Sequence, residues 1–182
     1  MIEFFSSSPE ETIAIGGRIA HKLRPLKTES STPTKTELLT PSKTESSTPS
    51  ITESLTPLSP EQKKQSSVIA LKGVLGSGKT CLTKGIANGL GIKETITSPT
   101  YTIINEYLAG KGLLYHIDAY RLLNSEDFDQ LGGRELLSSG SLTIIEWSDR
   151  IEKSIPEDAI KIEIKITGDQ SRIILISGLE LG

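Results

Sequence analysis

An apolar run, a glycine-rich octapeptide and an amphipathic segment follow one another in the middle of the chain, and this order constrains the fold more than any other feature. Ser67–Leu71 reads SVIAL, which is typical of a strand buried in the centre of a parallel sheet. Gly73–Thr80 reads GVLGSGKT and fits the pattern G-x-x-x-x-G-K-[ST] in full. Leu82, Ile86 and Leu90 then recur every fourth residue on one helical face. The order of strand, loop and helix predicts an α/β fold with a P-loop.

A loop of this type binds the phosphates of a nucleotide largely through its backbone. Glycines let the chain wrap closely around phosphate groups, while successive N–H groups and the N-terminus of the following helix point at the negative charge. Lys79 can reach the β- and γ-phosphates and is expected to act in catalysis, and the Thr80 hydroxyl can ligate Mg²⁺. The residues predicted to contact the nucleotide are Leu75, Gly76, Ser77, Gly78, Lys79, Thr80 and Cys81.

Two acidic residues each close an apolar strand, where a P-loop enzyme carries the carboxylate that holds the metal ion or its water molecules. Asp118 ends the run LLYHID, and Glu146 ends the run LTIIE. We predict that Glu146 supports Mg²⁺ and that Asp118 positions or activates the attacking water, and the residues alone also allow the reverse assignment. The N-K-x-D pattern of guanine-binding proteins is absent from the sequence.

Hydrophobic periodicity predicts a P-loop NTPase-like mixed sheet flanked by helices. In Ile160–Ile166, isoleucine alternates with lysine or glutamate, as in a half-buried strand. Ser8 precedes Pro9 and predicts a helix start, with serine at the N-cap and proline at the first helical position. Further strands are expected at Ile2–Phe5, Tyr101–Tyr107, Leu113–Ile117, Leu142–Glu146 and Arg172–Ser177, and helices at 9–23, 79–90 and 125–137, the last broken near Gly132 and Gly133.

An eight-residue unit occurs four times in residues 27–58, as KTESSTPT, KTELLTPS, KTESSTPS and ITESLTPL. Proline in every unit breaks any helix, and the apolar residues are too few to offset the entropy of ordering the tract. We interpret it as a disordered, low-complexity insert. The expected organisation is therefore the N-terminal strand and helix of the folded domain in residues 1–26, the insert in 27–58, and the P-loop part of the domain in 59–182.

The charge balance and the single cysteine exclude several classes of function. With 20 Lys and Arg against 23 Asp and Glu, the net charge is −3, so nonspecific binding of nucleic acid by the whole surface is not expected. One cysteine excludes an intrachain disulfide and a cysteine-cluster metal site. No apolar run approaches the roughly 20 residues of a membrane helix, and no signal peptide is visible. We therefore expect a soluble, cytoplasmic protein that does not bind membranes.

Five segments occur in a fixed order: LKGVLGSGKT, SPTYTIINEY, YHIDAYRL, LGGRELL and IEW. In this combination the sequence resembles the TsaE family, the ATPase components of bacterial tRNA threonylcarbamoyladenosine synthesis, over nearly all of the chain except residues 27–58. The resemblance implies an ATP- and Mg²⁺-dependent ATPase that is slow alone and works with TsaD-like and TsaB-like subunits. Together they would modify the adenosine beside the anticodon in tRNAs reading codons that begin with A, so that tRNA is an indirect partner.

The resemblance also implies roles for particular residues. Thr80 and Glu146 would contact Mg²⁺, and Asp118 would be needed for turnover. Ser98–Thr100 matches a segment that behaves as a switch near the γ-phosphate. Two further contacts in the nucleotide pocket are implied, at about Ser8, where the first helix starts, and at Arg172 near the C-terminal hairpin.

Other readings of the same residues remain open at this point. A small-molecule kinase would need an arginine-rich lid, for which only Arg134 and Arg150 are available. A noncatalytic nucleotide-sensing module would not need the two strand-end acids. His116 is either a proton carrier or a hydrogen-bonded structural residue, and Trp147 either reports nucleotide binding or packs the end of the sheet. Arg121 contacts either a phosphate or partner, or a nearby acid.

Overall fold

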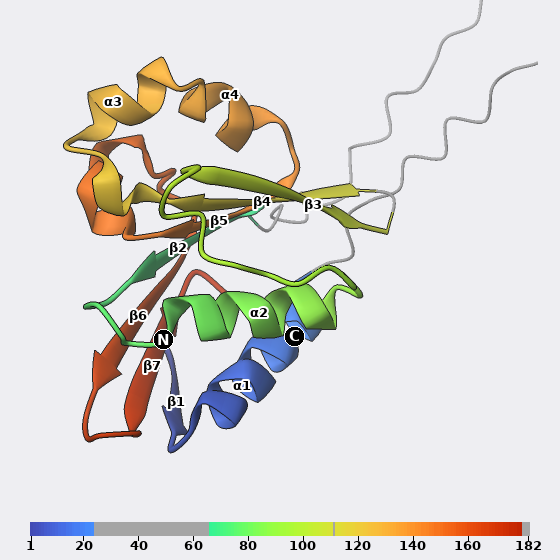
Figure 1. The fold of residues 1–182 in the computed structure, drawn as a ribbon, viewed down its shortest axis with the longest axis vertical. Coiled ribbons are helices and arrows are strands. Elements are labelled where there is room, and N and C mark those ends of the chain that lie inside the picture. The colour runs from blue at the N-terminus through green and yellow to red at the C-terminus, as the bar shows by residue number, and fades with distance from the viewer. Residues whose placement is uncertain (24–65, 111, 180–182) are drawn as a thin grey trace, which may run out of the picture. The chain divides into compact units, whose positions relative to one another are not determined.

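The computed structural model describes residues 1–23, 66–110 and 112–179, so the tract predicted to be a disordered insert lies outside the described residues. Within them, a seven-stranded sheet has the order β1-β7-β6-β2-β5-β4-β3 (Figure 1). This architecture confirms the predicted mixed α/β sheet flanked by helices. The strands are β1 (Ile2–Ser6), β2 (Val68–Lys72), β3 (Ile104–Ala109), β4 (Gly112–Asp118), β5 (Leu142–Glu146), β6 (Ile160–Ile166) and β7 (Arg172–Ser177). The helices are α1 (Pro9–Lys22), α2 (Lys79–Gly89), α3 (Ser125–Gln130) and α4 (Gly133–Ser138), with short 3₁₀ helices η1 (Ala119–Arg121) and η2 (Ser148–Ser154).

The carboxyl ends of β2, β5 and β4 meet at one edge of the sheet. β2 lies between β5 and β6 and is parallel to both, and β5 is also parallel to β4. In this register Leu71 pairs with Glu146, and Glu146 pairs with Asp118. Because the P-loop follows β2 directly, the register places both predicted acids at the edge of the sheet from which the P-loop starts.

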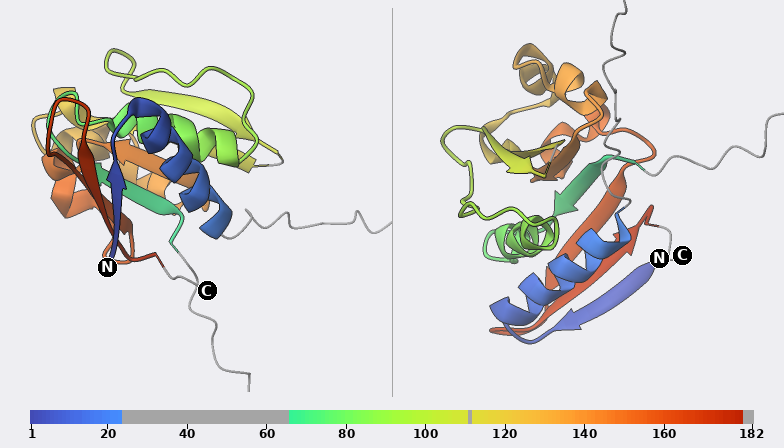
Figure 2. Two further views of the ribbon diagram at one scale, coloured as in Figure 1. Left: turned by 90° about the horizontal axis from the view of Figure 1, so that it is seen from below. Right: turned by 90° about the vertical axis from the view of Figure 1, so that its right-hand side faces the viewer.

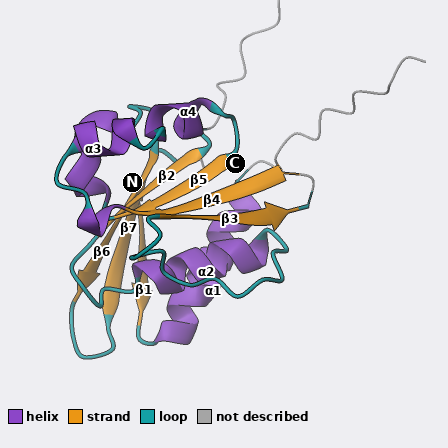
Figure 3. Ribbon diagram, turned by 45° about the horizontal axis from the view of Figure 1, so that its top comes forward, coloured by secondary structure: helices purple, strands orange, loops and turns teal. Residues whose placement is uncertain are grey.

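Helices cover both faces of the sheet (Figure 3). Side chains alternate along each strand, so Ile69 and Leu71 share a core with α1 and α2, whereas Val68 and Ile145 share a second core with Phe128 of α3. α1 and α2 lie side by side on their face (Figure 2). Among the described residues, no helix combines the length and the apolar character needed to cross a membrane.

α1 begins where the sequence predicts. The Ser8 hydroxyl accepts a hydrogen bond from the Glu11 N–H at 3.1 Å, as an N-cap residue does. The Glu11 carboxylate accepts hydrogen bonds from the backbone N–H and the hydroxyl of Ser7, at 2.6 and 2.8 Å. These two bonds lower the pKa of Glu11. Glu11, three residues after the N-cap Ser8, therefore accepts its hydrogen bonds from Ser7, the residue before the N-cap.

Glycines let α1 and α2 approach each other closely. A Cβ atom at Gly85 of α2 would overlap the carbonyl oxygen of Ile13, and one at Gly16 of α1 would overlap that of Leu82. At Gly17 a Cβ atom would meet only the carbonyl oxygen of Gly85, at 3.8 Å, which is ordinary contact. This close packing holds α1 against α2, the helix that follows the P-loop.

Two regions differ in detail from the prediction. β3 begins at Ile104 and not at Tyr101, because Ile103 takes a left-handed backbone conformation (φ 68°) and its N–H bonds the Pro99 carbonyl at 2.6 Å. The segment predicted as a broken helix is divided into α3 and α4, since Gly132 between them is left-handed (φ 78°). The break near this glycine is therefore confirmed.

Candidate nucleotide site

The P-loop links the end of β2 to the first turn of α2. Gly76 and Gly78 have φ angles of 74° and 104°, a left-handed conformation that favours glycine because a Cβ atom would be strained there. Gly78 is also the N-cap of α2, and no side chain caps the helix at this position. The N–H groups of the first turn are therefore available to an anion, which fits a nucleotide phosphate.

Lys79 lies at the start of α2 and is only 5% exposed. Its Nζ donates hydrogen bonds to the carbonyl oxygens of Gly73 and Val74, at 2.8 and 3.1 Å, and lies 3.8 Å from the centre of the Trp147 ring. Burial lowers the pKa of the Lys79 ammonium, and nearby carboxylates, Glu146 first among them, oppose this shift. A cation with so little water around it interacts strongly with a phosphate.

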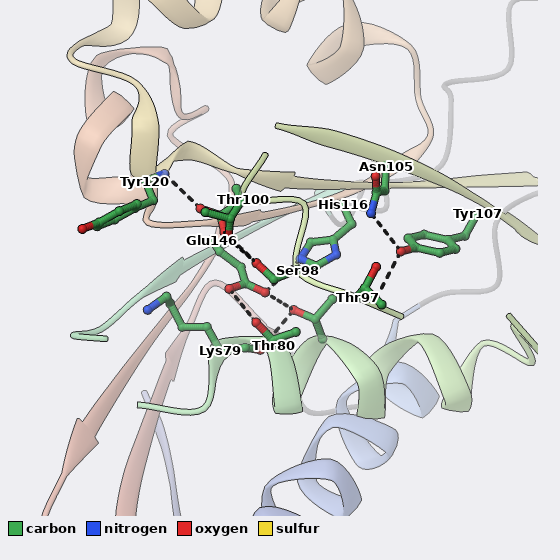
Figure 4. Close-up of polar contacts among 12 residues, drawn as sticks. Lys79, Thr80, Thr97, Ser98, Thr100, Asn105, Tyr107, His116, Tyr120 and Glu146 are labelled. Carbon is green, nitrogen blue, oxygen red and sulfur yellow. Dashed lines mark hydrogen bonds and ion pairs between the residues drawn. The ribbon is translucent and has the colours of Figure 1, made fainter. Parts of the chain in front are cut away.

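Glu146 connects α2 to β4 through both of its carboxylate oxygens (Figure 4). Thr80 Oγ1 donates to Oε2 at 3.0 Å. His116 Nε2 lies 2.8 Å from Oε1, and Thr83 Oγ1 lies 3.4 Å from the same oxygen. Glu146 is 2% exposed, so these partners take the place of water around its charge. The structure thus brings together Thr80 and Glu146, the two predicted metal ligands.

Asp118 is bound to the Ser98–Thr100 segment. Its Oδ2 accepts hydrogen bonds from the hydroxyls of Ser98 and Thr100, each at 2.8 Å, and its Oδ1 accepts one from the Tyr120 N–H at 3.0 Å. The Asp118 backbone N–H also bonds the Ile103 carbonyl at 2.9 Å. Asp118 is therefore in direct contact with the segment that the resemblance identifies as a switch.

The two further predicted pocket residues take different places. Nε and Nη2 of Arg172 each lie 3.3 Å from a carbonyl oxygen of Gly76–Ser77, so this arginine contacts the P-loop itself. Ser8 uses its hydroxyl to cap α1. Thr12 of α1 lies close to the loop, since a Cβ atom at Gly78 would lie 3.7 Å from its Cγ2. Arg172 therefore contacts the P-loop and Ser8 caps α1, and the pocket roles expected for these two residues stay predictions.

Several parts of the site were not predicted from the sequence. Thr83 could have been found, because it lies three residues after Thr80 on one helical face. The contact between Lys79 and Trp147 depends on a left-handed backbone at Trp147 (φ 58°), which no sequence pattern indicates. Of the residues predicted to contact the nucleotide, Leu75 is 80% exposed and Cys81 is half-buried.

The oxygen atoms at Thr80 and Glu146 suit Mg²⁺. This ion prefers oxygen ligands and commonly takes only one or two from the protein, with substrate phosphates and water supplying the rest. Across residues 1–23, 66–110 and 112–179, no group of three or more His, Cys, Asp or Glu residues could hold a metal ion by itself.

A hollow of about 280 Å³ lies away from these residues. It is formed by η2 and the strands β2, β6 and β7, and its lining includes Lys72, Glu152, Lys161 and Glu163. None of the predicted site residues lines it. The hollow is therefore separate from the candidate nucleotide site.

The loop between β2 and α2, which leads into a helix without a side-chain cap and carries a buried lysine, gives this chain the fold of the P-loop NTPase class. The model of a family described as "Threonylcarbamoyl adenosine biosynthesis protein TsaE" matches residues 42–174. The chain therefore belongs to the TsaE family, the family of tRNA threonylcarbamoyladenosine biosynthesis proteins, and the resemblance found in the sequence is confirmed.

Individual relatives agree with this assignment. Proteins named "tRNA threonylcarbamoyladenosine biosynthesis protein TsaE" from Treponema pallidum, Bacillus subtilis and Haemophilus influenzae are 41%, 40% and 38% identical to this chain. The similarity covers 63%, 64% and 65% of this chain and 84%, 72% and 75% of the respective relatives. The crystal structure of Bacillus subtilis YdiB is similar with a TM-score of 0.60 and 28% identity, covering 98% of this chain and 86% of that chain.

Proposed function

We propose that this chain is the Mg²⁺-dependent, ATP-hydrolysing subunit of a tRNA-modifying system. It would be required for threonylcarbamoylation of the adenosine next to the anticodon in tRNAs that read codons beginning with A. The observation that carries the proposal is the 3.0 Å bond between Thr80 Oγ1 and Glu146 Oε2, beside the buried Lys79. P-loop hydrolases use this combination of a cation for the phosphates and a hydroxyl and carboxylate for the metal. Family membership supports the tRNA pathway.

In the proposed reaction, the residues of the P-loop bind the phosphates. The backbone of Leu75–Cys81 and the ammonium of Lys79 would compensate their charge, while Arg172 supports the loop through its carbonyl oxygens. Thr80 and Glu146 would hold Mg²⁺, which when bound neutralises charge on the phosphates. Ser8 would contribute to the pocket by fixing the start of α1, where Thr12 faces the loop.

Asp118 is proposed to position the attacking water. Its Oδ2 already accepts hydrogen bonds from Ser98 and Thr100, so these hydroxyls must give way before that oxygen can accept a bond from water. This arrangement supports slow hydrolysis by the chain alone. Partner subunits, proposed to be TsaD-like and TsaB-like, would accelerate hydrolysis by moving the Ser98–Thr100 segment.

The same proposal also predicts how the domain is organised, how the protein contacts tRNA and where in the cell it acts. Residues 1–26 and 59–182 would form the ATPase domain, with 27–58 as an insert in it. The net charge of −3 favours indirect contact with tRNA through the partner subunits. Because a tRNA-modifying system acts where tRNA is found, we place the protein in the cytoplasm.

The small-molecule kinase is less well supported. Of the two arginines available for a lid, Arg134 binds Asp129 at 2.7 Å, and Arg150 lies 5.5 Å from the centre of the Tyr120 ring. Both are engaged with neighbouring side chains. A noncatalytic sensor is disfavoured as well, because Asp118 and Glu146 are both buried at the P-loop edge, where a sensor has no need of two carboxylates.

Asp118→Ala tests the proposed reaction. Phosphate release should fall by about 10²-fold or more, as expected for the loss of general-base or positioning help, while ATP still binds. Release is measured with and without the TsaD-like and TsaB-like subunits, and threonylcarbamoyladenosine in tRNA is measured by nucleoside analysis after depletion of the protein. Asp158→Ala, an exposed aspartate before β6, is the control and should behave as the wild type. Unchanged turnover in Asp118→Ala would contradict the proposal.

A further inference from the structure

His116 is a buried residue that the proposed reaction does not use. It lies on β4, two residues before Asp118, and is completely shielded from solvent. Its Nε2 lies 2.8 Å from Oε1 of Glu146, itself 2% exposed. Burying a polar side chain costs free energy unless a hydrogen bond replaces those it makes with water, and for His116 the bond to Glu146 does so.

The direction of this hydrogen bond is fixed by chemistry. A carboxylate that holds Mg²⁺, as the proposed function requires of Glu146, is ionised and can only accept hydrogen bonds, so His116 carries a proton on Nε2 and donates a hydrogen bond to Glu146. Nδ1 of His116 has no hydrogen-bond partner among the described protein groups. The imidazole therefore presents one directed N–H to the carboxylate, in the manner of a residue that orients a metal ligand from behind.

The other contacts of Glu146 do not fix its orientation as firmly. The Thr83 hydroxyl has a single proton and two acceptors within reach, the Lys79 carbonyl at 3.1 Å and Glu146 Oε1 at 3.4 Å. The shorter of these leads to the backbone, as is common for threonine in helices. The Thr80 hydroxyl bonds Oε2, but the proposed function assigns Thr80 itself to the metal. His116 is then the donor that holds Oε1 whether or not metal is bound.

We propose that His116 is a positioning residue for the metal ligand: by donating from Nε2 to Oε1 of Glu146, it turns Oε2 toward Thr80 and the P-loop. This inference rests on the proposed function. It predicts that His116 affects the Mg²⁺-dependent part of nucleotide binding and leaves binding without Mg²⁺ nearly unchanged. Residues that orient metal ligands in this way typically change metal affinity by 10- to 100-fold when they are replaced.

The test measures ADP affinity of the full chain by calorimetry, with Mg²⁺ and with a chelator. His116→Leu removes the donor, whereas His116→Gln keeps an N–H group at about the position of Nε2. We expect His116→Leu to weaken ADP binding about 10- to 100-fold in Mg²⁺ and less than about threefold without it. His116→Gln should restore binding to within about threefold of the wild type in both conditions.

Ile144→Val is the matched control, because Ile144 pairs with His116 across β4 and β5 and is equally buried. It should lower the melting temperature through a small cavity without changing the effect of Mg²⁺. Equal losses in His116→Leu and His116→Gln, or a Mg²⁺ effect unchanged in His116→Leu, would overturn the inference while the proposed function stands. A wild-type protein that binds ADP equally well with and without Mg²⁺ would overturn both.

A second measurement decides the matter even if His116→Leu does not fold. The sequence has two histidines, His21 and His116, and His21 is exposed, so their ¹⁵N ring signals are easily distinguished by NMR. The wild-type protein should show His116 protonated at Nε2, with signals that shift when Mg²⁺ is added to the ADP complex. A neutral ring protonated at Nδ1 could not donate to Glu146 and would refute the proposal.

Discussion

The ammonium of Lys79 is surrounded by protein on several sides, with two carbonyl oxygens of its own loop and the Trp147 ring as neighbours. A bound phosphate would exchange neutral acceptors for a charged one, and two opposite charges attract each other strongly where little water screens them. In the proposed function, the free energy of nucleotide binding would therefore depend on the charge of the Lys79 side chain. Lys93, in contrast, is an exposed lysine beyond the far end of α2.

Lys79→Ala should abolish ATP hydrolysis and raise the dissociation constant for ATP at least about tenfold, which corresponds to about 1.4 kcal/mol. The phosphates then lose the cation that compensates their charge. Lys93→Ala removes the same charge away from the loop and should leave both quantities unchanged. Affinity is measured by calorimetry and turnover by phosphate release. Normal affinity and turnover in Lys79→Ala would show that the P-loop assignment is wrong.

At the residue scale, the sequence indicates candidate residues more readily than backbone conformation. Lys79, Thr80, Asp118 and Glu146 could be chosen as candidates because their spacing and their positions after strands are local properties of the chain, and their roles stay predictions. In the described part of the chain, the non-glycine residues with positive φ are Ile103 and Trp147, and they adjoin Asp118 and Glu146. A bulky residue takes this conformation only when surrounding contacts impose it, so it could not be predicted.

At the scale of the helices and strands, the close packing of α1 against α2 requires that glycines at the crossing carry no Cβ atom. Gly85→Ala should lower the free energy of unfolding by about 1–3 kcal/mol, because its Cβ atom would overlap the Ile13 carbonyl and force the helices apart. Gly17→Ala, the matched control, has room for its Cβ atom and should stabilise the protein by up to about 1 kcal/mol through helix propensity. Urea unfolding measures both. Equal effects of the two substitutions would mean that the helices are not in close contact.

Strands with a strong hydrophobic period were predicted with nearly correct boundaries, whereas the start of β3 and the 3₁₀ helices, which depend on turns, were not predicted. β2, β5, β6 and β7 match the expected strands within one residue, since apolar runs and strict alternation leave little choice of boundary. The start of β3 was placed three residues too early, because Tyr101–Ile103 is as apolar and β-branched as a strand but forms a turn. The 3₁₀ helices η1 and η2 were not anticipated, as such short pieces lack a period of their own.

At the scale of the molecule, the arrangement that makes the site was only partly contained in the sequence. The order of elements indicated a parallel centre, but the neighbours of β2 could not be known, since strand order depends on long-range packing. The structure places β5 directly beside β2 and β4 next to β5. Glu146 is therefore one strand away from the P-loop and Asp118 two, which agrees with the metal role proposed for Glu146.

Residues 27–58 should be dispensable for nucleotide binding. All the residues assigned to the site lie outside this tract, and α1 ends at Lys22 while β2 begins at Val68. Replacing residues 27–58 with a short Gly/Ser linker should leave ATP affinity within about threefold, or about 0.7 kcal/mol. Calorimetry on the full chain and on the replaced chain makes the comparison. A tenfold loss of affinity would show that the tract contributes to the site.

The pairing of β1 with β7 has a consequence for protein synthesis. Ile2 pairs with Ile176 and Ser6 with Arg172, so this edge of the sheet joins segments from opposite ends of the sequence. On the ribosome, β1 is made first and stays without its partner until β7 has been translated. Pairings of such large sequence separation are slow to form, because the entropy of closing the loop must be overcome first. Until then, the nascent chain exposes an apolar strand that chaperones, or other nascent copies, can bind.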